Sequence, residues 1–479
     1  MDEHGQSDGD RTAPHHRRAP SRRAVLTGAT GAGALALAVS PVTGAAAAPP
    51  SVATPELRRA GARALDFLQV MTDAYPGANG DGPVLAQSYS DQNGLFSTAF
   101  VYDQALSVCA ALATGTARGE ALARRLGDGL LFAQGNDPTY DDGRLRQAYN
   151  VGPYVFYDGV PQPYGLRLPD GTANIGYQFG FLGTAVGDMA WPGMALVQLH
   201  ERTGAQRYLD GALAIARWIT TNARNSGALG GFSFGVTAGD ERIPNVSTEH
   251  NVDCVGFFRQ LAAATGDRTW LAEADRARAF LGRVWEPEGG YFYTGSDDGT
   301  TVNRDPLPLD PQAWSWLALR EGRYARALDW AGQALAVTDD AAQPLSQLPD
   351  GVRVSGVTFS SASLTSTAVY NGLQVNPQGV WLEGTGQLAT AYADRGRGQA
   401  DARRARGLLG QITVAQDLVG QDQTVGGAPL PADSGVVAAT SVLDTGFGFA
   451  YFPSQHIGAT AWFLMGVEGA NPFVRGGLR

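Results

Sequence analysis

The chain of 479 residues carries a formal net charge of −10, and all of its positive side chains are arginines because the sequence contains no lysine. An acidic chain is a poor partner for nucleic acid, whose phosphates attract clustered positive charge. The missing lysine also excludes Schiff-base chemistry and the lysine of a phosphate-binding P-loop.

Residues 1–48 are predicted to be a twin-arginine signal peptide with a polar N-terminal tail. The pair Arg22-Arg23 precedes a mildly apolar, glycine-rich run and then an alanine-rich segment. This order is typical of an export signal, and the arginine pair favours the twin-arginine route over the general secretory route. We expect cleavage near Ala46–Ala48, followed by a single secreted, monomeric domain over residues 49–479.

No later segment is apolar and long enough to span a bilayer, so we expect no membrane partner after the signal is removed. The two cysteines, Cys109 and Cys254, are expected to be free thiols. Only His200, His250 and His456 lie beyond the signal, and none has a second ligand at zinc-site spacing. We therefore expect neither a metal nor a cofactor.

A repeated pattern of paired helices follows the signal. Each unit has a helix rich in small and apolar residues, a glycine-containing turn and an amphipathic helix that carries arginines. The first helices of the pairs are predicted near 98–114, 190–203, 248–265, 310–320, 379–394 and 454–467. The second helices are predicted near 117–134, 206–224, 268–285, 323–337 and 399–416. Such self-similarity indicates a repeat architecture.

The helix predicted at 55–74 has no earlier partner, and we expect it to pair with the last helix, at 454–467. That pairing closes twelve helices into an all-α ring of six hairpins, which leaves no exposed apolar end. Long aromatic links lead into the first helices and should gather on one face, where functional residues are often carried. Within them, residues 230–234 and 289–293 predict short β-hairpin strands.

Four motifs near the predicted starts of first helices are typical of a known superfamily: Tyr102-Asp103-Gln104-Ala105-Leu106, Thr248-Glu249-His250-Asn251-Val252-Asp253, Trp381-Leu382-Glu383-Gly384-Thr385-Gly386 and Tyr451-Phe452-Pro453. Together with the helix count, they make residues 49–479 resemble the six-hairpin glycosidases, the (α/α)6 toroid enzymes. The resemblance implies one catalytic domain with its active site in the funnel at the N-termini of the inner helices. The usual chemistry there is glycoside hydrolysis, but some relatives are lyases or sugar epimerases.

Carboxylates near the starts of the first helices are the candidate catalytic groups, since glycoside hydrolysis needs an acid and a base or nucleophile. Glu383 stands in an apolar, glycine-rich context, which favours a raised pKa and the role of general acid. Its partner is expected among Asp103, Glu249 and Asp253. Each of these acids could instead have a structural role, either as a buried hydrogen-bonding group or as a first-turn carboxylate that interacts favourably with the helix dipole.

Three N-caps are predicted on alternating inner helices, at Ser97, Ser247 and Asn376. They would place the candidate acids of those helices at nearly the same depth in the ring. With helix axes roughly 9 Å apart, the carboxyl groups would then lie roughly 5–9 Å from one another, which overlaps both catalytic spacings of glycosidases.

Candidate substrate-binding side chains lie near the same helix starts: Tyr102, Trp191, His250, Asp310, Trp314, Trp381, Gln455 and His456. The tryptophans suit stacking on sugar rings but are equally typical of a hydrophobic core. Asp310 precedes a proline, as a helix cap often does. A lone histidine is more often structural than catalytic.

The sequence leaves three functions open. The leading hypothesis is a secreted glycoside hydrolase that cleaves an oligo- or polysaccharide by carboxylate acid–base catalysis. The second is a lyase or sugar epimerase. A uronate lyase needs a cation for the substrate carboxylate, and an epimerase needs paired histidines, which His250 and His456 leave open. The third is a non-catalytic glycan-binding protein, which would have aromatic side chains without a functional acid pair.

Overall fold

The computed structural model describes residues 52–176 and 180–478, which belong to one compact unit spanning Pro49–Arg479. The arginine pair and the cleavage site of the expected export signal lie outside the described residues. In the described ranges, no helix is both long enough and apolar enough to cross a lipid bilayer.

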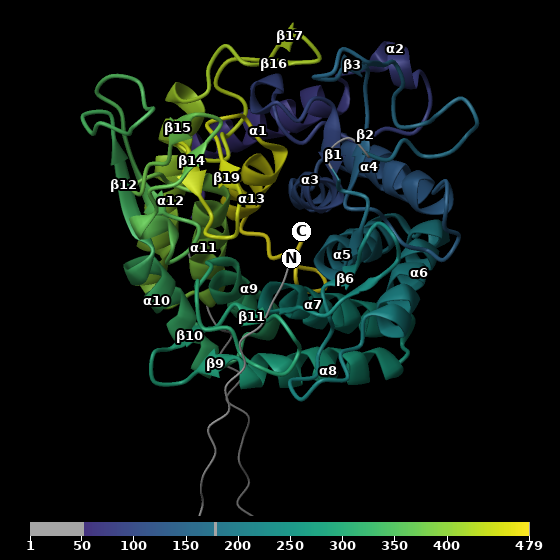
Figure 1. Ribbon diagram of the computed structural model, residues 1–479. Coiled ribbons are helices and arrows are strands. Elements are labelled where there is room, and N and C mark those ends of the chain that lie inside the picture. Colours follow the sequence, from purple (N-terminus) through teal and green to yellow (C-terminus); the bar gives the residue numbers. More distant parts are fainter. Residues whose placement is uncertain (1–51, 177–179, 479) are drawn as a thin grey trace, which may run out of the picture. The chain divides into compact units, whose positions relative to one another are not determined.

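Six helices form a closed inner ring in which each contacts its two neighbours and the last contacts the first (Figure 1). Small and apolar residues let these helices pack on every side. Every residue of the last one before Glu468 is buried. In ring order the inner helices are α3 (Val101–Ala113), α5 (Val186–Thr203), α7 (Thr248–Thr265), α9 (Asp310–Leu319), α11 (Leu382–Arg395) and α13 (Ile457–Glu468).

Six amphipathic helices form the outer layer, and each packs its apolar stripe against one inner helix. The first of them packs against α13, so the predicted pairing of the first and last helices is confirmed and the ring closes. The outer helices are α1 (Pro55–Thr72), α4 (Ala117–Gly135), α6 (Gln206–Asn222), α8 (Thr269–Arg283), α10 (Ala325–Ala334) and α12 (Gly398–Leu418). A short helix, α2 (Pro76–Asn79), follows α1.

The links between hairpins carry short antiparallel strand pairs and one three-stranded sheet. The pairs are β1 (Thr98–Phe100) with β2 (Ala148–Asn150), β3 (Tyr154–Val155) with β4 (Pro161–Gln162), β8 (Val246–Ser247) with β11 (Gly295–Ser296), β9 (Trp285–Glu286) with β10 (Tyr291–Phe292), β12 (Ala336–Asp340) with β13 (Arg353–Val357), β14 (Val369–Tyr370) with β15 (Leu373–Gln374), β16 (Thr424–Val425) with β17 (Ala428–Pro429) and β18 (Leu443–Asp444) with β19 (Ala450–Tyr451). The sheet joins β5 (Thr184–Ala185), β6 (Gly235–Val236) and β7 (Arg242–Ile243). Single 3-10 turns occur at Asp91–Asn93, Gly322–Tyr324 and Ser363–Thr365.

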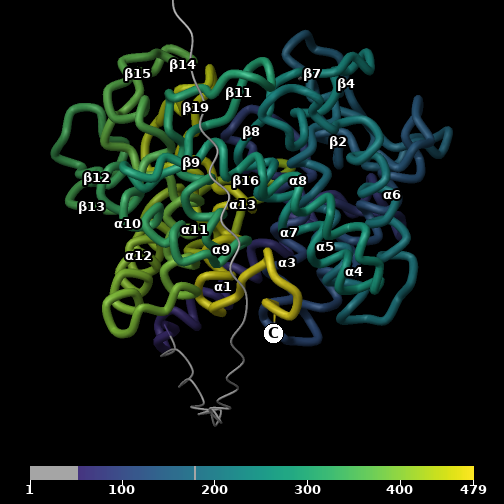
Figure 2. Tube along the Cα trace, turned by 90° about the horizontal axis from the view of Figure 1, so that it is seen from below, coloured from purple at the N-terminus to yellow at the C-terminus, as the bar shows by residue number. Residues whose placement is uncertain are grey.

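Most of the strand-bearing links lie at one end of the ring, and the chain that follows α13 lies at the opposite end (Figure 2). This C-terminal segment crosses the far end of the ring. Gln198 on α5 and Gln260 on α7 both donate to the carbonyl of Pro472. The ring of Phe473 packs edge-on against Trp191, with 4.9 Å between ring centroids. The C-terminal segment therefore closes this end of the ring of helices.

Hydrogen bonds between links hold the starts of the inner helices. The amide of Val101 donates to Gln147, and that of Val186 donates to Phe234. In both cases the acceptor belongs to the link that precedes the next inner helix. The same kind of backbone hydrogen bond recurs around the helix ring. The amides of Thr248, Leu309, Leu382 and Ile457 donate to the carbonyl groups of Thr294, Phe359, Ala438 and Ser88, respectively. Each helix start is thus positioned by its neighbour's link.

These backbone contacts explain why two of the three predicted N-caps are wrong. Ser247 caps α7 as predicted and accepts from the amide of His250 at 3.4 Å. Ser97 instead donates to the carbonyl of Gly152, and the N-cap residue of α3 is Phe100. Asn376 likewise lies before the helix, and the N-cap residue of α11 is Trp381. Asp103 and Glu383 therefore lie in the first turns of their helices, whereas Asp253 lies deeper, beyond the first turn of α7.

The helix ends lie close to the predicted ones, and the largest difference is at α5, which begins at Val186 and not at 190. The predicted helix end at 337 is wrong, because α10 ends at Ala334 and β12 begins at Ala336. Both cysteines are unpaired and buried, as predicted for thiols on α3 and α7, which are separated by α5 in the ring.

Candidate active site

An inner cavity of about 180 Å³ opens at the N-terminal ends of the inner helices. Five of the six inner helices and two of the links contribute to its wall. The lining residues are Tyr102, Gly187, Asp188, Trp191, Glu249, His250, Asp253, Asp310, Trp314, Phe359, Trp381, Glu383, Phe449 and Tyr451. An engineered apolar cavity of about 150 Å³ admits benzene, so the inner cavity has room for one six-membered ring.

Five inner helices each carry one acid in their first turn: Asp103, Asp188, Glu249, Asp310 and Glu383. A carboxylate is favoured there by the helix dipole. The sixth inner helix, α13, has His456 as its N-cap residue, and its ring accepts from the amide of Ala459. The link contacts that fix each helix start therefore also bring these acids toward one axis.

Nine of the twelve predicted site residues line the inner cavity: Tyr102, Trp191, Glu249, His250, Asp253, Asp310, Trp314, Trp381 and Glu383. Asp103, Gln455 and His456 do not. The side-chain amide of Gln455 instead donates to the carbonyl of Gly420 at 2.8 Å, which holds a link in place. Asp310 is the first residue of α9 and not its cap, and its carboxyl group accepts from Gln387 at 2.9 Å.

Asp103 and His456 form a buried pair behind the cavity wall. The Nε2 atom of His456 lies 3.1 and 3.2 Å from the two carboxyl oxygens of Asp103. Its Nδ1 atom lies 3.7 Å from Glu383. The ring of His456 stacks on Tyr89 with 4.1 Å between centroids. A side chain at Gly458 would collide with this pair, because an added Cβ atom would lie 2.7 Å from the Asp103 carboxyl group.

Charge governs the protonation of His456. Burial alone would lower its pKa, but the neighbouring carboxylates of Asp103 and Glu383 raise it above the usual value. The positive charge that this imidazole gains on protonation favours the ionised form of Glu383. Asp103 thus acts on the cavity through His456 and does not face the cavity itself.

Glu383 is the most extensively hydrogen-bonded acid of the cavity. The hydroxyl group of Tyr102 donates to it at 2.6 Å, and Gln387 donates at 3.4 Å. The indole of Trp462 donates to the Tyr102 oxygen at 3.1 Å, which fixes the direction of the phenol. These donors orient Glu383 and stabilise its carboxylate.

The cavity acids are unusually basic because they are buried together. Burial raises the pKa of Glu383 to about 7 and that of Glu249 to about 8. It also raises the pKa of Asp188 and of Asp310 to about 7 each. The pKa of Asp253 lies well above its usual range, because the group is buried and lies near Glu249. At neutral pH the cavity therefore holds both proton donors and carboxylates.

His250 is a neutral member of the lining. Burial lowers its pKa to about 4. Its Nε2 atom lies 3.6 Å from Glu249, and its Nδ1 atom has no hydrogen-bond partner among the described residues. The indole nitrogens of Trp314 and Trp381 likewise have none. Buried polar atoms are rarely left without partners, and these three atoms all belong to side chains of the cavity wall.

Asp188 was missed by the sequence analysis. It is the third residue of α5, as Asp103 is of α3, and Gln147 donates to it at 3.2 Å. The predicted start of α5 at 190 left Asp188 in a link. Aligning the two helix starts by their repeat would have found it. The aromatic lining residues Phe359 and Phe449 come from links, where the sequence shows no periodicity to place them.

A second cavity of about 440 Å³ adjoins the inner one. The two share Glu249, His250, Phe359 and Phe449 in their linings, so they adjoin one another along these residues. Neither lining contains an arginine among the described residues. In the same ranges, no group of three or more His, Cys, Asp or Glu side chains is arranged to hold a metal ion.

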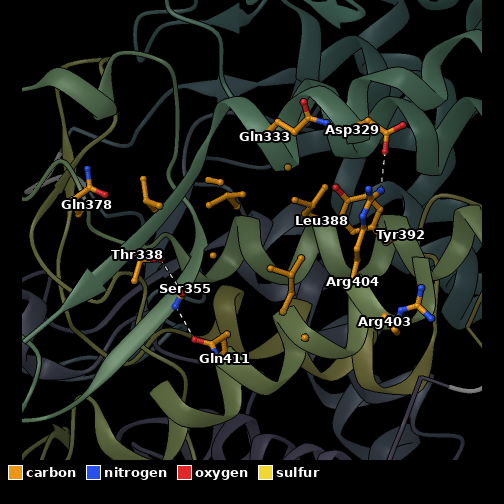
Figure 3. Close-up of a pocket in the computed structure, with 17 residues that line it drawn as sticks. Asp329, Gln333, Thr338, Ser355, Gln378, Leu388, Tyr392, Arg403, Arg404 and Gln411 are labelled. Carbon is orange, nitrogen blue, oxygen red and sulfur yellow. Dashed lines mark hydrogen bonds and ion pairs between the residues drawn. The ribbon is translucent and has the colours of Figure 1, made fainter. Parts of the chain in front are cut away.

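Another cavity, of about 680 Å³, lies apart from the inner helix starts, between α10, α12 and the β12–β13 pair (Figure 3). Its wall includes Arg404, whose guanidinium group donates to Asp329 at 2.9 Å. The backbone amide of Ser355 donates to the side-chain oxygen of Gln411 at 2.7 Å. The lining contains one carboxylate, already paired with arginine, so it offers no acid–base pair.

No protein-family model matches the chain, and no curated protein matches it in sequence. Solved structures do match. A sugar epimerase from a ruminal bacterium has 12% identity and a TM-score of 0.54, covering 86% of this chain and 98% of the epimerase. A D-mannose isomerase has 11% identity and a TM-score of 0.55, with 88% and 98% covered.

Glycoside hydrolases match equally well. A family 76 glycoside hydrolase from a bovine Bacteroides thetaiotaomicron strain has 9% identity and a TM-score of 0.53, with 87% of this chain and 78% of the hydrolase covered. Structural matches at sequence identities this low show similarity of fold alone. The predicted fold class is confirmed: this chain has the (α/α)6 toroid fold.

Proposed function

We propose that this chain is an exported glycoside hydrolase that cleaves an uncharged oligo- or polysaccharide by carboxylate acid–base catalysis. The observation that carries the proposal is the pair Glu383 and Glu249, on alternate inner helices, both facing a cavity for one sugar ring. Their pKa values are raised by burial, which suits proton transfer near neutral pH.

Position and hydrogen bonding suggest different roles for the two acids. Glu249 borders both cavities, so it lies where the bond between a sugar in the inner cavity and the next unit would lie. It suits the role of general acid, because burial and the neighbouring carboxylates hold its pKa above the usual range. Glu383 accepts from Tyr102 and lies near His456, which favours a carboxylate acting as base or nucleophile. This reverses the role that the sequence favours for Glu383.

The rest of the lining suits a neutral sugar. Trp191, Trp314 and Trp381 contribute aromatic rings to the wall. Aromatic walls with a few directed polar atoms are typical of small-molecule sites. The acidic lining would repel an anionic sugar.

An epimerase is less well supported. His456 forms a hydrogen bond with Asp103 through Nε2 and accepts one from the backbone amide of Ala459 through Nδ1. It does not line the cavity. The cavity therefore presents one histidine and not a pair. A uronate lyase lacks the cation that it needs for the substrate carboxylate, because neither cavity contains an arginine in the described lining and the chain has no lysine.

Incubation with a panel of uncharged glucose- and mannose-based oligosaccharides tests the proposal. We expect new reducing ends without the ultraviolet absorbance of an unsaturated sugar. Glu383→Gln should lower turnover by about 10²–10⁴-fold while the melting temperature stays unchanged. Near-normal turnover in Glu383→Gln would remove the centre of the proposed mechanism, and binding without turnover by the native protein would favour a glycan-binding protein.

A further inference from the structure

The outer cavity continues the inner one and has two chemically different walls. Glu249, His250, Phe359 and Phe449 line both spaces, so they mark the junction. A molecule longer than one ring that occupies the inner cavity can reach the outer one along these residues. The outer cavity, at about 440 Å³, is more than twice as large as the inner one.

One wall of the outer cavity is aromatic and unusually exposed. Phe447 and Phe449 lie in the loop between β18 and β19, with 44% and 47% of their surface exposed. Both rings lie near Phe359, with 6.0 and 6.2 Å between centroids. Exposed large apolar groups at the rim of a cavity indicate a binding surface.

The loop that carries these rings is fixed before any ligand binds. The amide and the hydroxyl group of Thr445 both donate to the carbonyl of Phe449, at 3.1 and 2.8 Å. The amide of Phe447 donates to the hydroxyl oxygen of Thr445 at 3.2 Å. Gly446 adopts a φ of +81°, and an added Cβ atom would lie 2.6 Å from Ala362. The two aromatic side chains are therefore held on an ordered turn.

The remaining lining of the outer cavity is mainly polar. It includes Asn245, Ser247, Ser296 and Asn303, which supply amide and hydroxyl groups. Asn245 donates to Asp297 at 3.2 Å, which orients both side chains. A pyranose has apolar C–H faces and a polar hydroxyl edge, so it matches an aromatic wall combined with a polar one.

We infer that the outer cavity is a second sugar subsite, which holds an uncharged pyranose unit linked to the unit in the inner cavity. Phe447 supplies its stacking surface. This inference rests on the proposed function and adds the place and the side chain that hold the second pyranose unit of the substrate. Phe447 lines the outer cavity and not the inner one, so its substitution leaves the lining of the inner cavity unchanged.

The test is calorimetric titration of the full chain on a Glu383→Gln background, so that ligand is not consumed. The probes are glucose, mannose and their uncharged di- and trisaccharides. We expect a disaccharide to bind about tenfold more tightly than its monosaccharide. Phe447→Ala should abolish that gain, and Phe447→Tyr should retain it. Leu373→Ala, on β15 and 45% exposed, is the matched control and should leave it unchanged.

The outcomes separate the two proposals. Equal affinity for mono- and disaccharides, or a gain that survives in Phe447→Ala, overturns the second subsite and leaves the proposed hydrolase standing. A native protein that binds and cleaves none of the probes overturns both. Loss of the gain in Leu373→Ala as well would show that the effect is not local to the outer cavity and would also overturn the assignment.

Discussion

At the scale of single residues, the acids of the cavity serve the helices and the site together. Each of Asp188, Glu249, Asp310 and Glu383 lies in a first turn, where the helix dipole favours negative charge. All four also line one cavity without an arginine in its described lining. Burial overrides the dipole and raises their pKa values, so the group shares protons at neutral pH.

The two proposed roles predict opposite responses to the leaving group. A strongly acidic phenol leaves its sugar as a phenolate, without protonation. Glu249→Gln should therefore hydrolyse an aryl glycoside of this kind almost as fast as the native enzyme. The same variant should lose about 10²–10⁴-fold on an oligosaccharide. Glu383→Gln should be slow on both substrates. Steady-state turnover on the two substrates measures this, and rescue of Glu383→Gln by the good leaving group would exchange the two roles.

The raised pKa values also predict how stability depends on pH. An acid whose pKa is higher in the folded state holds its proton there after the unfolded chain has lost it. Stability is therefore lost as pH rises from the unfolded value near 4 toward the folded values near 7 and 8. His250, whose pKa is lowered, opposes this below about pH 6.5, but it is one group against several.

We therefore expect the midpoint of urea unfolding to fall between pH 5 and pH 8. Glu249→Gln should flatten that dependence, because it removes one of the acids concerned. Asp66→Asn, an exposed acid on an outer helix, serves as a control and should leave the slope unchanged. A midpoint that rises over this range would contradict the account of the cavity.

At the scale of elements, the helices were largely predictable because their patterns are local. Apolar spacing and glycine turns located all twelve ring helices, and α7 was predicted from Thr248 to Thr265 as observed. The starts of α3 and α11 were not predictable, since backbone groups from distant links hold them and leave no side-chain signature. For the same reason Asp188 was missed and Asp103 was expected in the cavity, although it faces His456.

Three helices meet at a buried arginine, which gives a prediction about packing. The guanidinium group of Arg395, at the end of α11, pairs with Asp401 on α12 at 2.8 Å and with Asp329 on α10 at 2.9 Å. It also donates to the carbonyl of Ala325 at 2.7 Å. Its side chain is 1% exposed, and the guanidinium group of Arg404 lies farther from Asp401, at 3.8 Å, so the loss of Arg395 would leave Asp401 buried without its nearer charge partner.

Arg395→Ala should lower the free energy of unfolding by about 3–5 kcal/mol. Arg395→Lys should not restore it, because an ammonium group cannot reproduce the forked contacts of a guanidinium group. Arg59→Ala is the control, since its pair with Glu56 is exposed and should matter little. Urea unfolding measures all three variants, and equal stability of Arg395→Ala and native protein would contradict this account.

At the scale of the whole domain, closure of the ring was predictable from the unpaired first and last helices. The closing segment after α13 was not, because it has no periodic pattern. Phe473 packs beneath Trp191 and Trp314, and Asn471 donates to the carbonyl of Leu317. The cavity therefore opens toward the links and not through the ring.

A site with one opening and room for one ring in its inner cavity predicts action at chain ends. The product released from an uncharged oligosaccharide should be a monosaccharide from the first turnovers onward. The remaining chain should shorten one unit at a time. Chromatography of a time course measures this, and early appearance of mixed internal fragments would show that the chain crosses the site and that the far end of the ring is open.

The central claim is that the acid pair adds water across a glycosidic bond. The most direct measurement is mass spectrometry of the products formed in water enriched with oxygen-18. The account predicts shorter saccharides in which each new reducing end carries one solvent oxygen, and loss of that signal in Glu383→Gln. Saccharides of unchanged length, or unsaturated products without solvent oxygen, would contradict it.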